Sequence, residues 1–318
     1  MLSAMCTFLT LTPNPALDLA TRTEWVLPTH KLRCDTALHY PGGGGVNVAR
    51  VLHRLGGDVQ AWCLAGGHTG AQLQQLLAAE GVPTQITPIQ GNTRENFSVI
   101  QTATGEEFRF VLPGPLVQAH EWQAWQGSIT ALAPTPRWTV ASGSLPPGLP
   151  DDFYAQLARQ AHARGQRLAL DSSGAALAAA LQVGVYLLKP SLRELRELTG
   201  AALTETDQWC AAAQALVQGG QAQMVALSAG EQGAVLATRD GVWLTPALPL
   251  AATTGTTGAG DCFLAALVWA LERGEPPQEA LRWGVAAGTA ALLAPGTALA
   301  DPADIRRLHP QVALRQVA

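Results

Sequence analysis

The sequence is poor in charge, in cysteine and in long apolar runs. Charged residues make up only 14% of its 318 residues, and Lys and Arg form no basic stripe, so nucleic acid is not an expected partner. The five cysteines are scattered without a C-x-x-C pair, which argues against disulfides or a zinc site and favours a reducing cytoplasm. No run of about 18 uncharged apolar residues occurs, so no membrane span is expected.

Apolar residues, 47% of the chain, fall into alternating strand-like and helix-like segments. The apolar start, Met1 to Leu11, has no basic flank and is interrupted at Thr12-Pro13, so it predicts a strand rather than a signal peptide. A polar, turn-rich segment is expected from there to Tyr40. Further strands are predicted at 59–65, 96–101, 107–112, 138–141, 167–171, 184–188 and 224–228, a hairpin at 235–244, and helices at 46–55, 70–81, 152–164, 192–198, 207–218, 260–272 and 277–293.

This alternation predicts a three-layer αβα domain with a mostly parallel central sheet covered by helices on both faces. The chain shows no internal repeat and no long linker, so residues 1–318 are expected to form a single domain. Polar and glycine-rich segments follow several predicted strands. In open α/β sheets that edge binds ligands, so the functional site is expected there.

The most informative motif is Thr253-Thr254-Gly255-Thr256-Thr257-Gly258-Ala259-Gly260-Asp261. Three glycines at the start of a helix leave backbone N–H groups free to bind an anion, such as a phosphoryl group in transfer. A carboxylate in the first turn, Asp261, can accept the proton of an attacking hydroxyl. The alternative is that Asp261 only caps the helix. The chain contains no Walker A motif and no G-x-G-x-x-G after a strand.

Two further segments are candidate sugar-binding sites. Gly42 to Gly45 precede a predicted helix and offer a wall without side chains, with Asn47 available to bond hydroxyl groups. Asp18, which follows the first predicted strand, could accept hydrogen bonds from two hydroxyls. Considered separately, the glycine stretch is more simply interpreted as a flexible loop, and Asp18 as a turn aspartate.

Charged residues supply the remaining candidates. Lys31, Arg33, Arg94 and Arg109 stand near turns or strands and could pair with phosphate, although each alone could be a solvated surface charge. Glu194 begins a predicted helix after Lys189-Pro190. It could organise Mg²⁺ and its waters, or it could simply stabilise the helix start.

Together, the glycine-rich stretch Gly42–Arg50, the Thr257–Asp261 motif and their order resemble the ribokinase-like (PfkB) family of sugar kinases. The resemblance extends from Thr12 to Thr297. Within the family, the strings Phe108–Gly114, Ser142–Gly148 and Asp171–Gly174 are most similar to the branch that phosphorylates ketohexose phosphates. The implied reaction is therefore ATP-dependent phosphorylation of such a sugar, with fructose 6-phosphate the first candidate and a place in glycolysis. Relatives that use fructose 1-phosphate or tagatose 6-phosphate typically carry Gly-Lys-Gly at Gly43–Gly45.

The resemblance also implies roles for individual residues. Asp261 would be the base, and the amides of Thr257, Gly258, Ala259 and Gly260 would form the anion hole. Sugar contacts are implied for Asp18, Gly43, Gly44 and Asn47, and contacts to the sugar's own phosphate for Arg94, Ser144 and Lys31, the last from a neighbouring subunit; Arg109 is a further substrate-binding candidate. ATP contacts are implied for Lys189, Ser228, Gly230, Gly233 and also Thr257, Gly258 and Gly260, with Glu194 at Mg²⁺. A monovalent cation is a further candidate cofactor. Segments near 20–40 and 94–112 would form a small β-lid that makes a homodimer.

Two departures from the family pattern stand out. Ser191 replaces the usual Asn of Asn-x-x-Glu, and Thr257 replaces the commoner Val. Two other functions remain open at this stage. A kinase for an unphosphorylated sugar or a nucleoside would leave Lys31, Arg94 and Arg109 idle, and a noncatalytic sugar- or nucleotide-binding regulator would not need Asp261.

Overall fold

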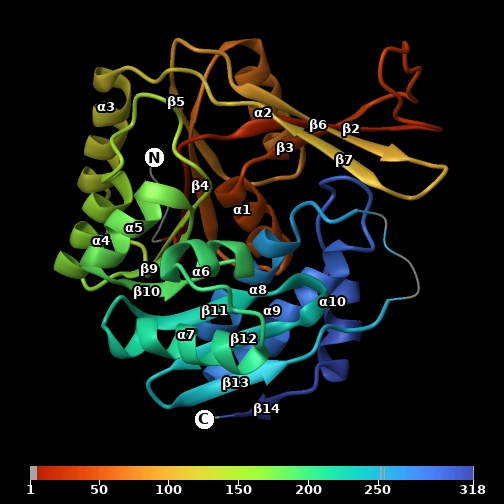
Figure 1. Ribbon diagram of the computed structural model, residues 1–318. Helices are drawn as coiled ribbons and strands as arrows, with labels where there is room; N and C mark the ends of the chain where they lie inside the picture. The colour runs from red at the N-terminus through yellow and green to blue at the C-terminus, as the bar shows by residue number, and fades with distance from the viewer. Residues whose placement is uncertain (1–5, 251–252, 254, 318) are drawn as a thin grey trace.

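A computed structural model describes residues 6–250, 253 and 255–317 of the chain (Figure 1). Met1 to Met5 of the apolar start and Thr254 of the glycine motif therefore lie outside the described residues. The main sheet consists of β1 (Phe8–Thr12), β4 (Val59–Ala65), β5 (Thr84–Pro88), β8 (Trp138–Ser142), β9 (Arg167–Asp171), β10 (Val185–Leu188), β11 (Ala222–Ser228), β12 (Ala234–Thr238), β13 (Gly241–Thr245) and β14 (Arg315–Gln316).

The order of these strands creates a crevice. It is β14-β13-β12-β11-β10-β9-β8-β1-β4-β5, with every neighbouring pair from β11 to β5 parallel and the remaining three pairs antiparallel. From β1 the chain moves outward through β4 and β5, then returns to β8 on the other side of β1 and proceeds to β11. Ligands in open α/β sheets bind beyond the carboxyl ends of the strands at such a reversal, here beyond Thr12 and Ser142.

Helices cover both faces of the main sheet, as the sequence predicts (Figure 1). One layer holds α1 (Gly44–Arg54), α2 (Gly67–Ala79), α8 (Ala259–Glu272), α9 (Pro277–Ala291) and α10 (Pro302–Leu308). The other holds α3 (Ala119–Ala131), α4 (Phe153–Ala163), α5 (Gly174–Val183), α6 (Leu192–Thr199) and α7 (Thr206–Gln218). Strand side chains alternate between the two cores. Ala226 faces the first, and Val225 and Leu227 face the second.

A second sheet of four strands, the small sheet, stands apart from the main one (Figure 1). Its order is β3 (Leu38–Gly42), β2 (Ala16–Thr23), β6 (Arg94–Gln101) and β7 (Glu107–Val111). In the register of β6 with β7, Phe97 pairs with Phe110 and Ser98 with Arg109. The alternation of side chains therefore places apolar rings on one face of this sheet and polar groups on the other.

The fold differs from the sequence-based expectations in several segments. β2 and β3 occupy part of the segment predicted to be polar and irregular, because that sheet buries only one face. Asp18 consequently lies within a strand of the second sheet rather than in a loop. The α3, α5 and α10 helices and the short β5 and β14 strands are also absent from the prediction. The α5 helix is so uniformly alanine- and leucine-rich that it lacks an amphipathic period. In the described part of the chain, no helix has the length and apolarity that crossing a bilayer requires.

Candidate active site

The start of α8 presents free backbone donors beside a carboxylate. Gly258, the residue before the helix, adopts φ +82°, a conformation that favours glycine, and a Cβ there would also displace the end of the Leu299 side chain. No side chain caps this end of the helix within the described residues. Asp261 is partly exposed in the first turn, and its Oδ2 accepts a hydrogen bond from Asn47 Nδ2 at 2.9 Å. Its carboxylate is therefore available as a base.

The surroundings of Asp261 tune its acidity. Burial raises the pKa of its carboxyl to about 7, and the nearby Asp171 carboxylate adds to the rise. The hydrogen bond from Asn47 and the charge of Lys189 act in the opposite direction. A carboxyl with a pKa close to neutral can accept a proton and later release it, as a general base requires.

Gly42 to Gly45, the last two of which begin α1, form a packed wall and not a flexible loop. A Cβ at Gly42 would lie 2.3 Å from Asp18 Oδ2, and one at Gly44 would lie 2.1 Å from Ser142 Oγ. The start of α1 can therefore enter the crevice between β1 and β8 only without side chains. This packing brings Asn47, which is buried, within reach of Asp261.

Arg50 fixes the orientation of the Asn47 amide. Its buried guanidinium donates from Nη1 to Asn47 Oδ1 at 3.3 Å and to the backbone oxygens of Pro41 and Thr297, each at 2.9 Å. Its Nη2 forms an ion pair with Glu80 at 2.6 Å. Because Asn47 receives a donor on its oxygen, its Nδ2 is the atom turned towards Asp261.

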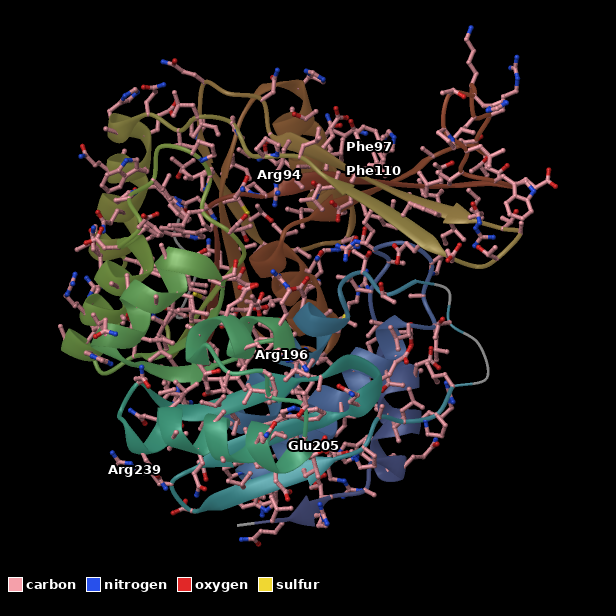
Figure 2. All side chains as sticks on the ribbon, viewed as in Figure 1. Arg94, Phe97, Phe110, Arg196, Glu205 and Arg239 are labelled. Atoms are coloured by element: carbon pink, nitrogen blue, oxygen red, sulfur yellow. The ribbon has the colours of Figure 1, made fainter. Side chains whose placement is uncertain are left out.

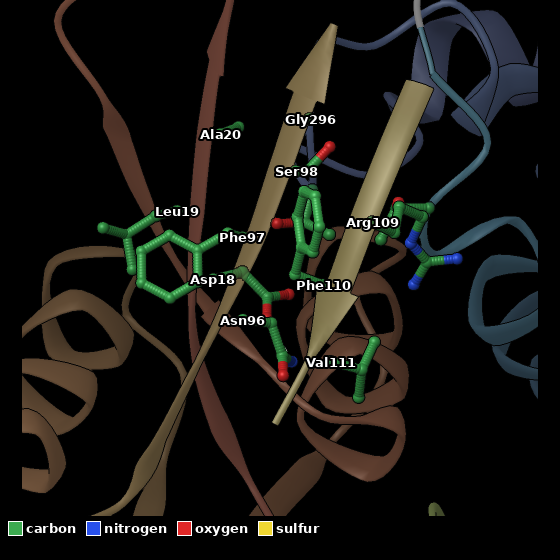
Figure 3. Close-up of a pocket in the computed structure, with 12 residues that line it drawn as sticks. Asp18, Leu19, Ala20, Asn96, Phe97, Ser98, Arg109, Phe110, Val111 and Gly296 are labelled. Carbon is green, nitrogen blue, oxygen red and sulfur yellow. The ribbon is translucent and has the colours of Figure 1, made fainter. Parts of the chain in front are cut away.

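Asp18 lies in a pocket between the small sheet and the main body (Figure 3). Asn96, Arg109, Thr257 and Thr297 are among the lining residues. Asn96 Nδ2 donates to Asp18 Oδ1 at 2.9 Å. Burial raises the pKa of Asp18, although that hydrogen bond and the charges of Arg109 and Arg94 oppose the rise. The pocket therefore combines a carboxylate, an amide, hydroxyls and a cation, which are groups that recognise a polyol.

Asn14 connects Arg94 and Ser144, because it forms hydrogen bonds with both (Arg94 is labelled in Figure 2). Arg94 Nη2 donates to the backbone oxygen of Asn14 at 3.0 Å, and its Nη1 donates to that of Leu112 at 3.0 Å. Asn14 Nδ2 donates to Ser144 Oγ at 3.2 Å. Among the described residues, Arg94 Nε is buried and has no hydrogen-bond partner. This guanidinium thus keeps N–H groups that could serve an anion.

A third group of charges surrounds Lys189 after β10. Its buried Nζ lies 3.2 Å from Asp171 Oδ2. Burial alone would lower the pKa of Lys189, but the carboxylates of Asp171, Glu194 and Asp261 outweigh it and raise that pKa. Lys189 is therefore a cation, and it reaches the start of α8, where a Cβ at Gly260 would lie 3.4 Å from Nζ.

The residues expected on the nucleotide side follow β10 and β11. Ser228 forms a bridge with Ser191. Gly230 and Gly233 bracket the short turn beyond β11, both with positive φ. Glu194 forms a capping box with Ser191: its Oε2 accepts from the Ser191 N–H at 2.8 Å, and Ser191 Oγ accepts from the Glu194 N–H at 3.2 Å. Glu194 thus does stabilise the helix start, and its charge also acts on Lys189, where it helps to raise the pKa.

Lys31 stands apart from the other candidates. It lies exposed on the long connection between β2 and β3, and it does not line the pocket around Asp18. Four other residues of the site were missing from the sequence-based candidates: Asn96, Thr297, Asp171 and Arg50. Only Asp171 carries a usable signal, since it ends a predicted strand at the ligand-binding edge.

A carboxylate at an uncapped helix start, beside a pocket lined by groups that can bind hydroxyls, is an arrangement suited to a kinase acting on a small hydroxylated molecule. A family model described as pfkB family carbohydrate kinase matches residues 13–304, and the chain belongs to this family.

Individual relatives agree with this assignment. The chain is 44% identical over 299 residues to the ATP-dependent 6-phosphofructokinase isozyme 2 of Mycobacterium tuberculosis, covering 94% of this chain and 88% of that protein. It is 31% identical to the 1-phosphofructokinase of Bacillus subtilis, covering 88% of this chain and 91% of the other. The crystal structure of Escherichia coli phosphofructokinase-2 in complex with substrates and products matches with a TM-score of 0.92 and 38% identity, over 97% of this chain and 99% of that one.

Proposed function

We propose that this enzyme transfers the γ-phosphoryl group of ATP to the free 1-hydroxyl of fructose 6-phosphate, giving fructose 1,6-bisphosphate and ADP. The observation that carries the proposal is the Asp261 carboxylate, held by Asn47 beside the uncapped amides of α8. The relatives named as phosphofructokinases support the choice of sugar phosphate. Arg94, with N–H groups to spare near Ser144, supports an acceptor that already carries a phosphate.

The proposed reaction is an in-line displacement. The sugar oxygen forms a bond to the γ-phosphorus while the bond from that phosphorus to the β-bridging oxygen breaks, and ADP leaves with the electron pair. Asp261 takes the proton of the attacking hydroxyl. The amides from Thr257 to Gly260 face the negative charge on the transferring group, aided by the positive end of the α8 dipole.

Substrate contacts follow from the pocket. Asp18 accepts hydrogen bonds from sugar hydroxyls, and the bare backbone at Gly43 and Gly44 lets the ring approach Asn47. Arg109 adds positive charge at the pocket wall. The small sheet acts as a lid over the sugar, and the whole chain works as one kinase domain.

ATP would lie beyond β10 and β11. Lys189 supplies a charge for its phosphates, and Ser228, Gly230, Gly233 and Thr257 supply contacts along it. Within the described residues no cluster of three acidic, His or Cys side chains could hold a metal directly, so Mg²⁺ would take its ligands from phosphate and water, with Glu194 ordering a water. When bound, the ion neutralises charge on the phosphates. A monovalent cation near the anion hole is a further proposed cofactor.

The enzyme is proposed to work as a homodimer through the lid. Phe97 and Phe110 are 40% and 52% exposed on the same face of the small sheet (Figure 2), and Trp25 and Leu27, which follow β2 in the chain, are 46% and 47% exposed. A second copy that covers this face could also bring Lys31 to the sugar phosphate of its neighbour. Because the described cysteines are all free, the cytoplasm is the proposed compartment.

A coupled ADP-release assay with a panel of acceptors tests the function. The panel contains fructose 6-phosphate, fructose 1-phosphate, tagatose 6-phosphate, fructose and a nucleoside. The highest kcat/KM is expected with fructose 6-phosphate. A preference for either of the other sugar phosphates would keep the kinase and change its substrate. A preference for fructose or the nucleoside would contradict the phosphate-binding role of Arg94. If none of the acceptors in the panel supports ADP release, the noncatalytic alternative is favoured.

A further inference from the structure

Glu107 joins the small sheet to the loop that precedes α8. It is the first residue of β7, and its Oε2 accepts hydrogen bonds from the Thr256 N–H at 3.0 Å and from Thr256 Oγ1 at 3.1 Å. Its Oε1 accepts from Thr257 Oγ1 at 3.0 Å and from Ser98 Oγ at 2.6 Å. One carboxylate thus receives four donors, three of them from a loop about 150 residues further along the chain.

The position of these contacts relates them to the reaction. Thr257 lines the same pocket as Asp18 and immediately precedes Gly258, whose positive φ turns the chain into α8. Ser98 lines that pocket from the small sheet. The contacts of Glu107 therefore run from the lid to the segment whose amides face the transferring phosphoryl group.

The charge of Glu107 is suited to this contact. Burial alone would raise its pKa, but the hydrogen bonds from Ser98, Thr256 and Thr257 outweigh it and hold the pKa below its ordinary value. The side chain is therefore an anion at neutral pH, and hydrogen bonds to a charged acceptor are stronger than those between neutral groups.

Thr257 is also one of the two departures from the family pattern. A Val side chain, the commoner residue there, has no hydroxyl and could not donate to Glu107. The hydroxyl of Thr257 thus has a partner that explains its presence: the carboxylate at position 107.

We propose that Glu107 is a positioning residue that closes the lid over the sugar pocket and fixes the anion-hole loop through Thr256 and Thr257. We call the hydrogen bonds from Thr256 and Thr257 to Glu107 the clasp. This proposal rests on the proposed function, because it assigns the clasp to sugar-phosphate binding. It differs from a role confined to the hairpin of β6 and β7, in which the bond to Ser98 would be the only one that matters.

Four variants test the clasp: Glu107→Ala, Thr257→Val, the double variant and Glu106→Ala. Glu106 is the matched control, because it lies next to Glu107 and, among the residues that the structure describes, its side chain bonds only Thr104 and Gln101 of its own hairpin. We expect the KM for fructose 6-phosphate to rise about tenfold in Glu107→Ala, the effect of losing a hydrogen bond to a charged group, and about threefold in Thr257→Val. The double variant should match Glu107→Ala, because the two changes break the same contact.

Two results would overturn the proposal. One is a Glu107→Ala enzyme with the KM of Glu106→Ala, and the other is a double variant whose effect is the product of the single effects. Hydrogen exchange in the ligand-free protein supplies a readout that does not depend on the substrate. The Thr256 amide, which donates to Glu107, should exchange faster in Glu107→Ala, while those of β6 remain protected. Loss of protection in β6 with no change at Thr256 would confine Glu107 to the hairpin. If the wild type fails to phosphorylate fructose 6-phosphate but the exchange result holds, the substrate proposal fails and the clasp stands.

Discussion

Replacing Asn47 by Leu removes the hydrogen bond that favours the ionised form of Asp261. The donor Nδ2 lies 2.9 Å from Asp261 Oδ2, and Arg50 keeps its other acceptors, the backbone oxygens of Pro41 and Thr297. A hydrogen bond to a charged group contributes about 1.5–3 kcal/mol. Since one pKa unit corresponds to about 1.4 kcal/mol, the pKa of Asp261 should rise by about one to two units above its value of about 7.

The assay is the pH dependence of kcat/KM for fructose 6-phosphate at saturating ATP. The ionised carboxylate is the active form, so the wild-type rate should rise with pH to a plateau, with a midpoint near 7. In Asn47→Leu the midpoint should move up by about one to two units. At pH 6 the variant should therefore lose about ten- to hundredfold beyond any loss on the plateau, because the rate falls tenfold per unit below the midpoint.

A control separates this effect from lost sugar contacts. Asn96→Leu removes a comparable amide, but one that donates to Asp18 and not to Asp261. That variant should lower the plateau and leave the midpoint near that of the wild type. If the midpoint of Asn47→Leu also stays at the wild-type value, Asn47 does not tune Asp261, and the assignment of the titrating base is wrong.

Two further predictions concern stability and substrate binding. The pKa of Asp261 is about 7 in the folded protein against an ordinary 3.8, so the folded state holds its proton more tightly and wild-type stability should fall as pH rises between these values. Asp261→Asn, which cannot titrate, should be more stable than the wild type by up to about 4 kcal/mol at pH 8 and no more stable below pH 4. Urea unfolding that shows no such pH-dependent gain in the variant would contradict the raised pKa. Arg94→Ala should raise the KM for fructose 6-phosphate about ten- to hundredfold but leave that for fructose nearly unchanged, and equal increases for both sugars would remove the phosphate contact.

The sequence predicts the main sheet well because its strands are short apolar runs separated by helical periods. It also predicts where Asp261 stands, in the first turn of a helix behind a glycine-rich start, because that pattern is typical of a backbone anion site. The family resemblance and the fold then agree over almost the whole chain.

The small sheet and its contacts follow less readily from the sequence. β2 and β3 mix polar with apolar residues and are mostly half-buried or exposed, so they lack the apolar signal of a core strand. The contact of Glu107 with Thr256 and Thr257 joins residues about 150 positions apart. The same applies to Arg50, whose partner Thr297 is nearly 250 residues away. Local patterns cannot predict such pairs, because only the tertiary fold brings them together.

Asp261→Asn tests the central claim most directly, since it keeps the shape of the side chain and removes the base. Turnover with fructose 6-phosphate and ATP binding should be measured on the same preparation. The account predicts that kcat falls by about 10²–10⁴-fold, the usual contribution of a general base, while the Kd for ATP changes little. A variant that turns over at the wild-type rate would contradict the role of this carboxylate at the start of α8.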